Sequence, residues 1–346
     1  MTAVLKRWES VLALVLVLEF VLFTSISPYF LSVDTLSDAT FNFTERAIVA
    51  LPLALLIIAG EIDISVAAII ALASVAMGLA AEQGAGTGGI VAIGLGTGLL
   101  AGCVNGALVT LGRVPSIVAT IGTMTLFRGM AYAVLGDRVL KNYPESFALF
   151  GQGYAFGPVS IELAVFMVLA VAFGLFLHRT RWGRAIYAIG ANPVASEFAR
   201  IRVDRYRFVL FALTGTACGL AAVLLTSRLG STRPSIAQGW ELEIISMVIL
   251  GGVSVWGGKG SILGVVLAAL VFGLVTFGLG LMNIPGIVMS IFTGTLLILV
   301  VALPRWCGAG EYSFAPDRST RRRQDQREDR VRRSGAGPGS VECAPG

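Results

Sequence analysis

Long runs of apolar residues fill the chain between residues 11 and 303, and short polar segments separate them. Most runs have the length of about 17 to 25 residues that a helix needs to cross a hydrocarbon core about 30 Å thick. Glycine, proline or charged residues bound each run, so we interpret the runs as membrane-spanning helices. The pattern predicts an all-α fold, a polytopic transmembrane helical bundle of about ten spans. The runs are 11–27, 47–60, 64–81, 90–111, 115–135, 161–177, 208–228, 242–256, 261–281 and 284–303.

Two of these runs are short for a span. Run 47–60 leads into the polar segment Gly60–Ser65, and run 242–256 ends in a cluster of glycines. Non-helical backbone at membrane depth needs protein or water partners for its polar groups. We therefore expect broken or re-entrant segments at both places, at the centre of the protein and near a transport pathway.

The composition fits an integral membrane protein, because 55% of the residues are hydrophobic and only 14% are charged. No small-residue cleavage site follows run 11–27, so we expect it to stay as an uncleaved first span. The four cysteines have no close spacing and His178 is the single histidine, which indicates neither a disulfide framework nor a metal site. The sequence shows no catalytic constellation, so we expect no enzyme and no cofactor. Arginines beside spans explain the net charge of +5 better than nucleic acid binding does.

Basic residues are distributed unequally between the two sets of connections. If the N-terminus is inside, the inside connections carry twelve lysines and arginines, and the outside connections carry five. Cytoplasmic connections carry the excess of positive charge in membrane proteins, so both termini are expected in the cytoplasm. After Pro304 the chain alternates arginines with acidic residues and then becomes rich in Gly, Pro and Ser. We expect a membrane domain over 1–304 and a disordered cytoplasmic tail over 305–346, or a tail that touches anionic lipid.

An internal repeat relates the two halves of the chain. With a shift of 170 residues, Val114–Leu126 lies over Ile284–Leu296 with seven identities in thirteen positions, and Gly60 lies over Gly230. The equivalent runs are five spans apart, an odd number, so the two repeats would have opposite orientations in the membrane. Inverted-topology repeats are typical of transporters that rock about a central pathway. Chance similarity between apolar, glycine-rich segments is the alternative.

The arginine-rich loop 183–207 cannot enter a bilayer and is the main candidate for a docking surface. Asn192 followed by Pro193 is a favoured helix start, and Val194, Phe198 and Ile201 then share one face. A nine-residue helix is marginal in water, so this face must pack on a partner groove or on the membrane surface. The glycine segment 251–261 lacks the spacing of a phosphate loop. If transport uses ATP, the ATPase is another chain.

Five motifs follow one another along the chain: Gly60–Ser65, Asn105–Gly106 with Val114–Ile117, Arg128–Gly129, Gly183–Asn192, and Gly251–Gly252 with Gly257–Ser261. In this order they resemble the motifs of the permease subunits of bacterial ABC monosaccharide importers, the ribose, arabinose, rhamnose and autoinducer-2 group. The resemblance implies a bacterial inner-membrane protein in the lipid bilayer. Its partners would be two cytoplasmic ABC ATPase subunits, a second permease, identical or paralogous, and a periplasmic sugar-binding protein.

By position, the resemblance makes residues 190–203 the coupling helix that docks in the ATPase. The candidate coupling residues are Gly190, Asn192, Pro193, Val194, Glu197, Phe198 and Ile201. The chain departs from the family pattern at Ala195-Ser196, at Arg200, where the family usually has glycine, and at Ala67. The rhamnose type is favoured by Asp38–Glu45 with Gly60-Glu61, and autoinducer-2 and ribose are the other candidate substrates.

Candidate pathway residues come from the same motifs: Glu61, Asp63, Ser65, Asn105 and Arg128. Carboxylates at a span junction are costly in lipid and mark a pathway or a helix-end contact. The alternative for Glu61 and Asp63 is a cytoplasmic turn in which Asp63 caps the next helix. For Arg128 we expect pairing with a carboxylate or snorkelling, with a role in substrate binding as the alternative. A gradient-driven secondary transporter or channel is the alternative function, which the scarcity of membrane-embedded titratable groups disfavours.

Overall fold

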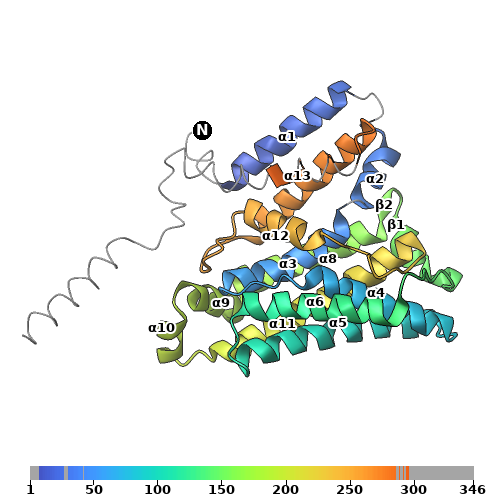
Figure 1. Cartoon of the computed structure of the whole chain (residues 1–346). Coiled ribbons are helices and arrows are strands. Elements are labelled where there is room, and N and C mark those ends of the chain that lie inside the picture. The colour runs from blue at the N-terminus through green and yellow to red at the C-terminus, as the bar shows by residue number, and fades with distance from the viewer. Residues whose placement is uncertain are drawn as a thin grey trace, which may run out of the picture. The chain divides into compact units, whose positions relative to one another are not determined.

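The computed structural model describes residues 8–26, 30–41, 43–285, 288, 291 and 294–295. Within these ranges the protein is built of helices apart from one small β-hairpin, which confirms the predicted all-α class (Figure 1). The longer helices are α1 (Trp8–Ile26), α2 (Val33–Phe41), α3 (Thr44–Ile58), α4 (Val66–Glu82), α5 (Thr87–Thr110), α6 (Ser116–Leu135), α8 (Ile161–Arg179), α9 (Arg181–Ala191), α11 (Val203–Leu229), α12 (Trp240–Leu250) and α13 (Ile262–Leu281). The short elements are η1 (Glu145–Phe147), α7 (Leu149–Gln152), β1 (Tyr154–Phe156), β2 (Val159–Ser160) and α10 (Pro193–Phe198).

Among the described residues, six helices are long and apolar enough to cross a membrane, and a seventh span results if α2 and α3, bent by 49°, are one broken span. The protein is therefore a polytopic helical membrane protein. The predicted count of ten is higher because α3, α4 and α12 have only 15, 17 and 11 residues. Nine of the ten predicted runs coincide with helices. Most of run 284–303 lies outside the described residues.

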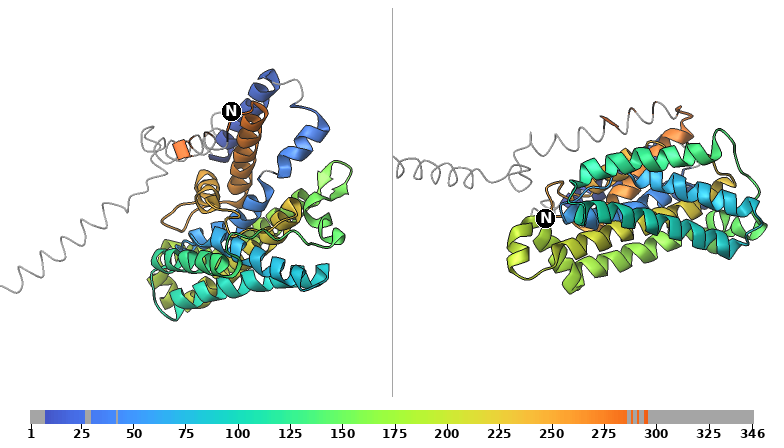
Figure 2. Two further views of the ribbon diagram at one scale, coloured as in Figure 1. Left: turned by 45° about the vertical axis from the view of Figure 1, so that its right-hand side comes forward. Right: turned by 60° about the horizontal axis from the view of Figure 1, so that its bottom comes forward.

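Helix α3 forms the centre of the bundle. Every residue of α3 except Arg46 is buried, and α11, α12, α8, α13 and α9 all pack on it (Figure 1). A helix that is apolar on all sides is stable only when it is enclosed by other elements. Helix α1 packs against α13 away from this centre, as the left view of Figure 2 shows.

Glycines bring α5 and α11 into backbone contact. A Cβ atom on Gly98 would collide with the carbonyl oxygen of Gly215, and a Cβ atom on Gly215 would collide with that of Gly98. Gly102 faces the backbone of α11 in the same way. Small residues allow such close approach of helices in membranes. Gly96, on the same helix, faces open space.

The bundle has two ends, which we call the α10 end and the hairpin end. At the α10 end, the Gly258 N–H donates to the Ile58 carbonyl at 2.8 Å, and the Tyr187 hydroxyl donates to the Gly260 carbonyl at 2.6 Å. At the hairpin end, β1 pairs antiparallel with β2, and Leu140 forms a β-bridge with Thr232. Helix α11 runs from the α10 end to the hairpin end, as Figure 1 shows.

The predicted repeat has partial counterparts in the structure. A shift of 170 residues places α4 over α12 and α5 over α13. Gly60 follows α3 with φ +86°, and Gly230 follows α11 with φ +58°, so both helices end at a left-handed glycine. The break after α3 lies at the α10 end, and the break after α11 lies at the hairpin end, as opposite orientation requires. Most of the second aligned segment, 284–296, lies outside the described residues, so the inverted repeat stays a prediction.

Candidate coupling and translocation site

The loop between α8 and α11 forms two helices, α9 and α10, which we call the coupling arm (residues 181–201). The Asn192 side chain accepts from the Ala195 N–H at 3.0 Å, and Pro193 occupies the first position of α10. Both features confirm the predicted helix start. The sequence analysis missed α9, whose start is capped by the Thr180 hydroxyl through the Gly183 N–H at 3.1 Å.

Helix α10 has six residues, shorter than the nine predicted. It ends because Arg200 has φ +60°, in the left-handed region that favours glycine. The family pattern places a glycine at this position, and glycine is the residue that adopts such a positive φ most readily. Ile201 therefore lies beyond the helix, and the predicted apolar face is made by Val194 and Phe198 without it.

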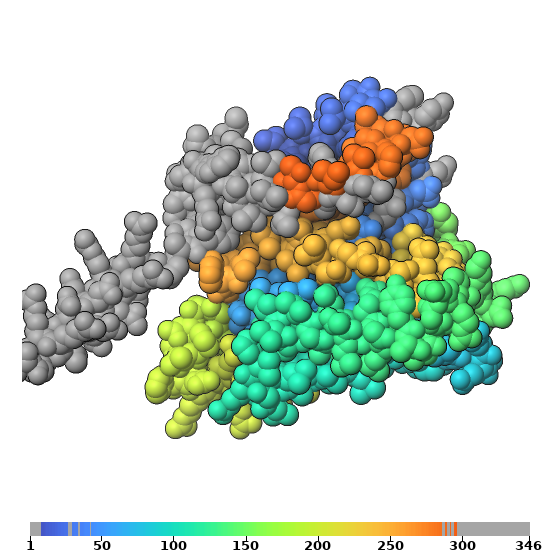
Figure 3. Space-filling model, in the orientation of Figure 1, coloured from blue at the N-terminus to red at the C-terminus, as the bar shows by residue number. Residues whose placement is uncertain are grey.

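The apolar face of α10 is uncovered in the described part of the chain. Phe198 is 86% exposed and Val194 is 62% exposed, and Glu197 is exposed beside them. Ser196 is buried on the opposite side, where its hydroxyl donates to the Asn192 carbonyl at 2.9 Å. In the space-filling view the yellow-green coupling arm projects at one end of the molecule (Figure 3), as it does in the right view of Figure 2. The arm thus carries an exposed apolar face.

The base of the coupling arm rests directly on the end of α3. A Cβ atom on Gly190 would collide with the Ile58 carbonyl oxygen, so the two backbones touch. The Ile58 carbonyl also accepts from the Gly258 N–H, and Tyr187 holds the glycine loop through the Gly260 carbonyl. Backbone contact leaves no flexible side chain between α9 and α3. The base of the arm and the end of α3 are therefore in direct backbone contact.

Three of the predicted pathway residues form one buried cluster after α3. Asp63 Oδ1 accepts from the Ser65 N–H at 2.8 Å and from the Ser65 hydroxyl at 2.6 Å. The Asn105 amide donates to Asp63 Oδ2 at 3.2 Å and to Ser65 Oγ at 2.7 Å. All three side chains are fully buried, and Asn105 Oδ1 has no partner among the described residues. The cluster ties the start of α4 to α5.

Asp63 is close to the helix start but does not cap it in the predicted way. Ser65 holds the N-cap position of α4, and Asp63 binds Ser65 itself rather than the amides of the first turn. A negative charge at a helix N-terminus is still favoured by the helix dipole.

The other two predicted pathway residues lie apart from this cluster. Glu61 forms an ion pair with Arg207 at 2.8 Å. Arg128 donates to the carbonyls of Pro234 and Ile236 at 2.7 and 2.8 Å. The prediction that Arg128 pairs directly with a carboxylate is therefore wrong, because the acceptors of its guanidinium are backbone carbonyls. The break between α11 and α12 offers carbonyl oxygens without helical partners, and a guanidinium has five N–H donors to satisfy them.

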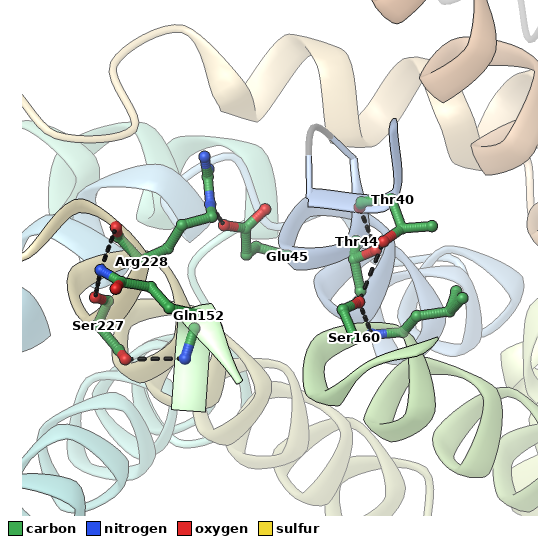
Figure 4. A network of polar contacts seen from close by, with 9 residues as sticks. Thr40, Thr44, Glu45, Gln152, Ser160, Ser227 and Arg228 are labelled. Atoms are coloured by element: carbon green, nitrogen blue, oxygen red, sulfur yellow. Dashed lines mark hydrogen bonds and ion pairs between the residues drawn. The ribbon is translucent and has the colours of Figure 1, made fainter. Parts of the chain in front are cut away.

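The sequence analysis missed a polar network at the hairpin end. Glu45 at the start of α3 forms an ion pair with Arg228 at 2.7 Å, and Gln152 donates to the Arg228 carbonyl at 3.1 Å (Figure 4). Glu162 is fully buried nearby, and Glu19 is buried within α1. Glu19 and Glu162 are thus buried carboxylates within two candidate spans, whereas a scarcity of membrane-embedded titratable groups was expected. In the sequence, the sign of such a group is Glu162, a glutamate inside the apolar run 161–177.

A helical bundle with several candidate spans and an exposed helical arm defines the class of the protein, a multi-pass membrane protein. Residues 36–301 match the family described as branched-chain amino acid transport system / permease component, and the chain belongs to this family. The autoinducer 2 import system permease protein LsrD of Photorhabdus temperata is 35% identical over 300 residues, which cover 85% of this chain and 90% of that protein. The proteins of the same name from Enterobacter sp. (strain 638) and Escherichia coli (strain K12) are 36% identical over 301 and 300 residues. The matched residues make up 92% and 91% of those two proteins, and 85% of this chain in each case. No solved structure matches the chain.

The family confirms the predicted class of protein. The chain is a permease component of a bacterial ABC importer, a non-catalytic membrane subunit, and such a component implies an ATPase and a binding protein as partners in general. The preference for a rhamnose-type permease finds no specific support, because the relatives named above are autoinducer 2 permeases.

Proposed function

We propose that this chain is the translocating permease subunit of an ATP-driven importer for autoinducer-2, a small sugar-derived solute. Rhamnose and ribose are the competing substrates. The observation that carries the proposal is the coupling arm, which offers Phe198 to a partner and rests on the buried helix α3. The relatives at 36% identity, named for autoinducer 2 import, support the substrate.

In this proposal α10 docks in a cytoplasmic ATPase subunit through Val194, Glu197 and Phe198. Closure of the ATPases on ATP moves the arm, and the contact of Gly190 with Ile58 passes the movement to α3. The break after α3 carries Glu61 and the Asp63 cluster, so these residues move first. The result of this movement is alternating access of a pathway, which lies between this chain and a second permease, identical or paralogous. A periplasmic binding protein delivers the solute at the hairpin end.

The orientation follows from the same arrangement. Nine of the twelve predicted inside charges are Arg113 in the loop between α5 and α6, Lys259, and the seven arginines from Arg179 to Arg207, the segment that contains the coupling arm. The arm and the Lys259 loop meet at the α10 end. We propose that this end faces the cytoplasm, with both termini on that side and ten spans built from an inverted repeat. The membrane domain is 1–304 in this proposal, and the tail 305–346 lies outside the described residues.

The test compares two exposed phenylalanines. Phe198 on α10 is 86% exposed and Phe156 on β1 is 82% exposed, at opposite ends of the bundle. In a strain that lacks this chain but keeps the other importer genes, the wild type should restore uptake of labelled autoinducer-2. Phe198→Asp should abolish both uptake and co-purification of the ATPase, whereas Phe156→Asp should keep co-purification of the ATPase.

Three outcomes would contradict the proposal. Retained ATPase binding by Phe198→Asp would remove α10 from the docking surface. Uptake of rhamnose or ribose in place of autoinducer-2 would reassign the substrate. Transport by purified chain under a proton or sodium gradient without any ATPase would favour the gradient-driven secondary transporter or channel.

A further inference from the structure

The glycine loop, residues 251–261, joins α12 to α13 at the α10 end and has a defined backbone. The Ser254 N–H donates to the Lys259 carbonyl at 3.0 Å, and the Gly257 N–H donates to the Ser254 carbonyl at 2.9 Å. Gly257 and Gly258 have φ +81° and +73°, in the left-handed region that glycine adopts readily. The loop therefore closes on itself as a turn.

This loop packs directly against the junction of α9 and α10. A Cβ atom on Gly257 would lie 2.9 Å from the Gly190 carbonyl oxygen, and one on Gly258 would lie 3.0 Å from the Ala191 nitrogen. Ala191 ends α9 and precedes Asn192, the cap of α10. Figures 1 and 3 show the orange loop beside the yellow-green coupling arm. The loop and α10 are thus neighbouring elements at one end of the molecule.

The turn between Ser254 and Lys259 carries an exposed tryptophan. Trp256 is 68% exposed, and Phe198 on α10 is 86% exposed. The structure describes every residue of the coupling arm and of the glycine loop, and these two are their exposed aromatic residues. Tryptophan and other large aromatic side chains supply much of the binding energy at protein interfaces. Two exposed aromatic residues on adjoining elements indicate a contact surface that extends beyond α10.

Helix α10 is too small to form a stable interface alone. Stable protein interfaces take about 20 to 30 residues from each partner and bury about 800 Å² on each side. Helix α10 has six residues. A partner that binds it with a surface of ordinary size must therefore cover neighbouring elements as well, and the glycine loop is in direct contact with the residues before its cap.

The exposed charge at this end indicates the chemistry of the partner. Between residues 179 and 207, six of the seven arginines are exposed, and Lys259 on the glycine loop is exposed too. The exposed acids of the same segment are Glu197 and Asp204. A complementary partner surface is therefore acidic. Anionic lipid headgroups also attract basic residues and tryptophan, so the membrane surface is the competing occupant.

We propose that the glycine loop is a second docking element for the ATPase subunit that binds α10, with Trp256 as its anchor. The inference rests on the proposed function, because it names the same partner. The contact of the loop with the junction of α9 and α10 favours the ATPase over lipid. The fitting surface on the ATPase is an apolar pocket for the indole ring with acidic groups beside it.

Photochemical crosslinking in the assembled importer, in its native membrane, tests the proposal. The photoreactive analogue p-benzoylphenylalanine replaces Trp256, Phe198 or the hairpin residue Phe156, one at a time. Illumination should link the analogue at the first two positions to the ATPase, and at the third position it should not. Linkage at Phe198 without linkage at Trp256 would overturn this inference and leave the proposed function intact. Linkage of the Trp256 position to lipid alone would also overturn it, and no linkage at either position would contradict the proposed function itself.

Affinity for the ATPase gives a second measurement. In the purified membrane complex stripped of its ATPase, Trp256→Ala should raise the Kd for the added ATPase at least about tenfold. Phe156→Ala, at the opposite end, should leave the Kd unchanged. The thermal midpoint of Trp256→Ala without ATPase should equal that of the wild type, because the side chain is exposed. An unchanged Kd for Trp256→Ala would overturn its role as an anchor.

Discussion

Arg207 and Glu61 form an ion pair of 2.8 Å that joins the first turns of α11 to the break after α3. The Glu61 side chain is 9% exposed and the Arg207 side chain is 24% exposed, so the pair is largely removed from solvent. Arg207 belongs to the segment that follows the coupling arm, and Glu61 precedes the Asp63 cluster. The pair is therefore a second link between the arm and the candidate pathway.

Removal of Arg207 should harm the protein more than removal of both charges. Arg207→Gln leaves Glu61 as an uncompensated, nearly buried carboxylate, and we expect a loss of about 2 kcal/mol in the free energy of unfolding. The double variant Arg207→Gln with Glu61→Gln should recover part of that loss. A double-mutant cycle by thermal unfolding in detergent measures the difference, with the exposed Arg205→Gln as control. Equal losses in the single and double variants would show that the two charges are not coupled.

The contact between the arm and α3 predicts a sharp effect at Gly190. Gly190→Ala places a methyl group against the Ile58 carbonyl and should separate α9 from α3. We expect ATP hydrolysis by the assembled importer to continue while solute uptake falls at least tenfold. Gly122→Ala on α6 is the control, because nothing lies within 4 Å of a Cβ atom there. Normal uptake by Gly190→Ala would mean that the arm transmits its movement through other contacts.

The glycine contact between α5 and α11 predicts a difference between two neighbouring positions. Gly98→Ala should destabilise the protein by about 1–3 kcal/mol, since the new methyl group overlaps the backbone of α11 at Gly215. Gly96→Ala, two residues away on the same helix, faces open space and should be neutral or slightly stabilising. Thermal unfolding of the two variants side by side measures this contrast. Similar midpoints would place the helices further apart than described.

The Asp63 cluster predicts a structural cost at one buried carboxylate. Asp63→Ala removes the acceptor of three hydrogen bonds, from Ser65 twice and from Asn105 once. At about 1 kcal/mol for each bond we expect a loss of about 3 kcal/mol in the free energy of unfolding. Asp204→Ala, an exposed acid in the first turn of α11, should change stability much less. Denaturant titration of both variants is the measurement. An unchanged midpoint for Asp63→Ala would show that the cluster does not contribute to the stability of the core.

The parts of the fold that depend on local sequence were predictable. Apolar runs between breakers placed nine helices, because each run must satisfy its own backbone in a membrane. Asn192 and Pro193 predicted the start of α10, because a cap and a first-position proline act within a few residues. The end of α10 was not predicted, because Arg200 gives no local sign of a left-handed conformation.

The partners of the charged residues were not predictable, because they come from distant segments. Glu61 meets Arg207 across 146 positions, and Arg128 reaches carbonyls of Pro234 and Ile236 more than 100 positions away. No periodicity carries such information. The buried state of Glu162 likewise depends on how α3 packs beside α8, which a single run of sequence does not show.

The enclosure of α3 has a mechanical consequence. One end of this helix is held by the pair of Glu45 with Arg228, and the other end is gripped by the backbones of Gly190 and Gly258. Except at Arg46, α3 has no free surface along its length, so its neighbours limit how far the helix can bend at Pro52. A push of the ATPase on one side of the membrane would then be felt at the ionic cluster on the other side, and the reverse would hold as well.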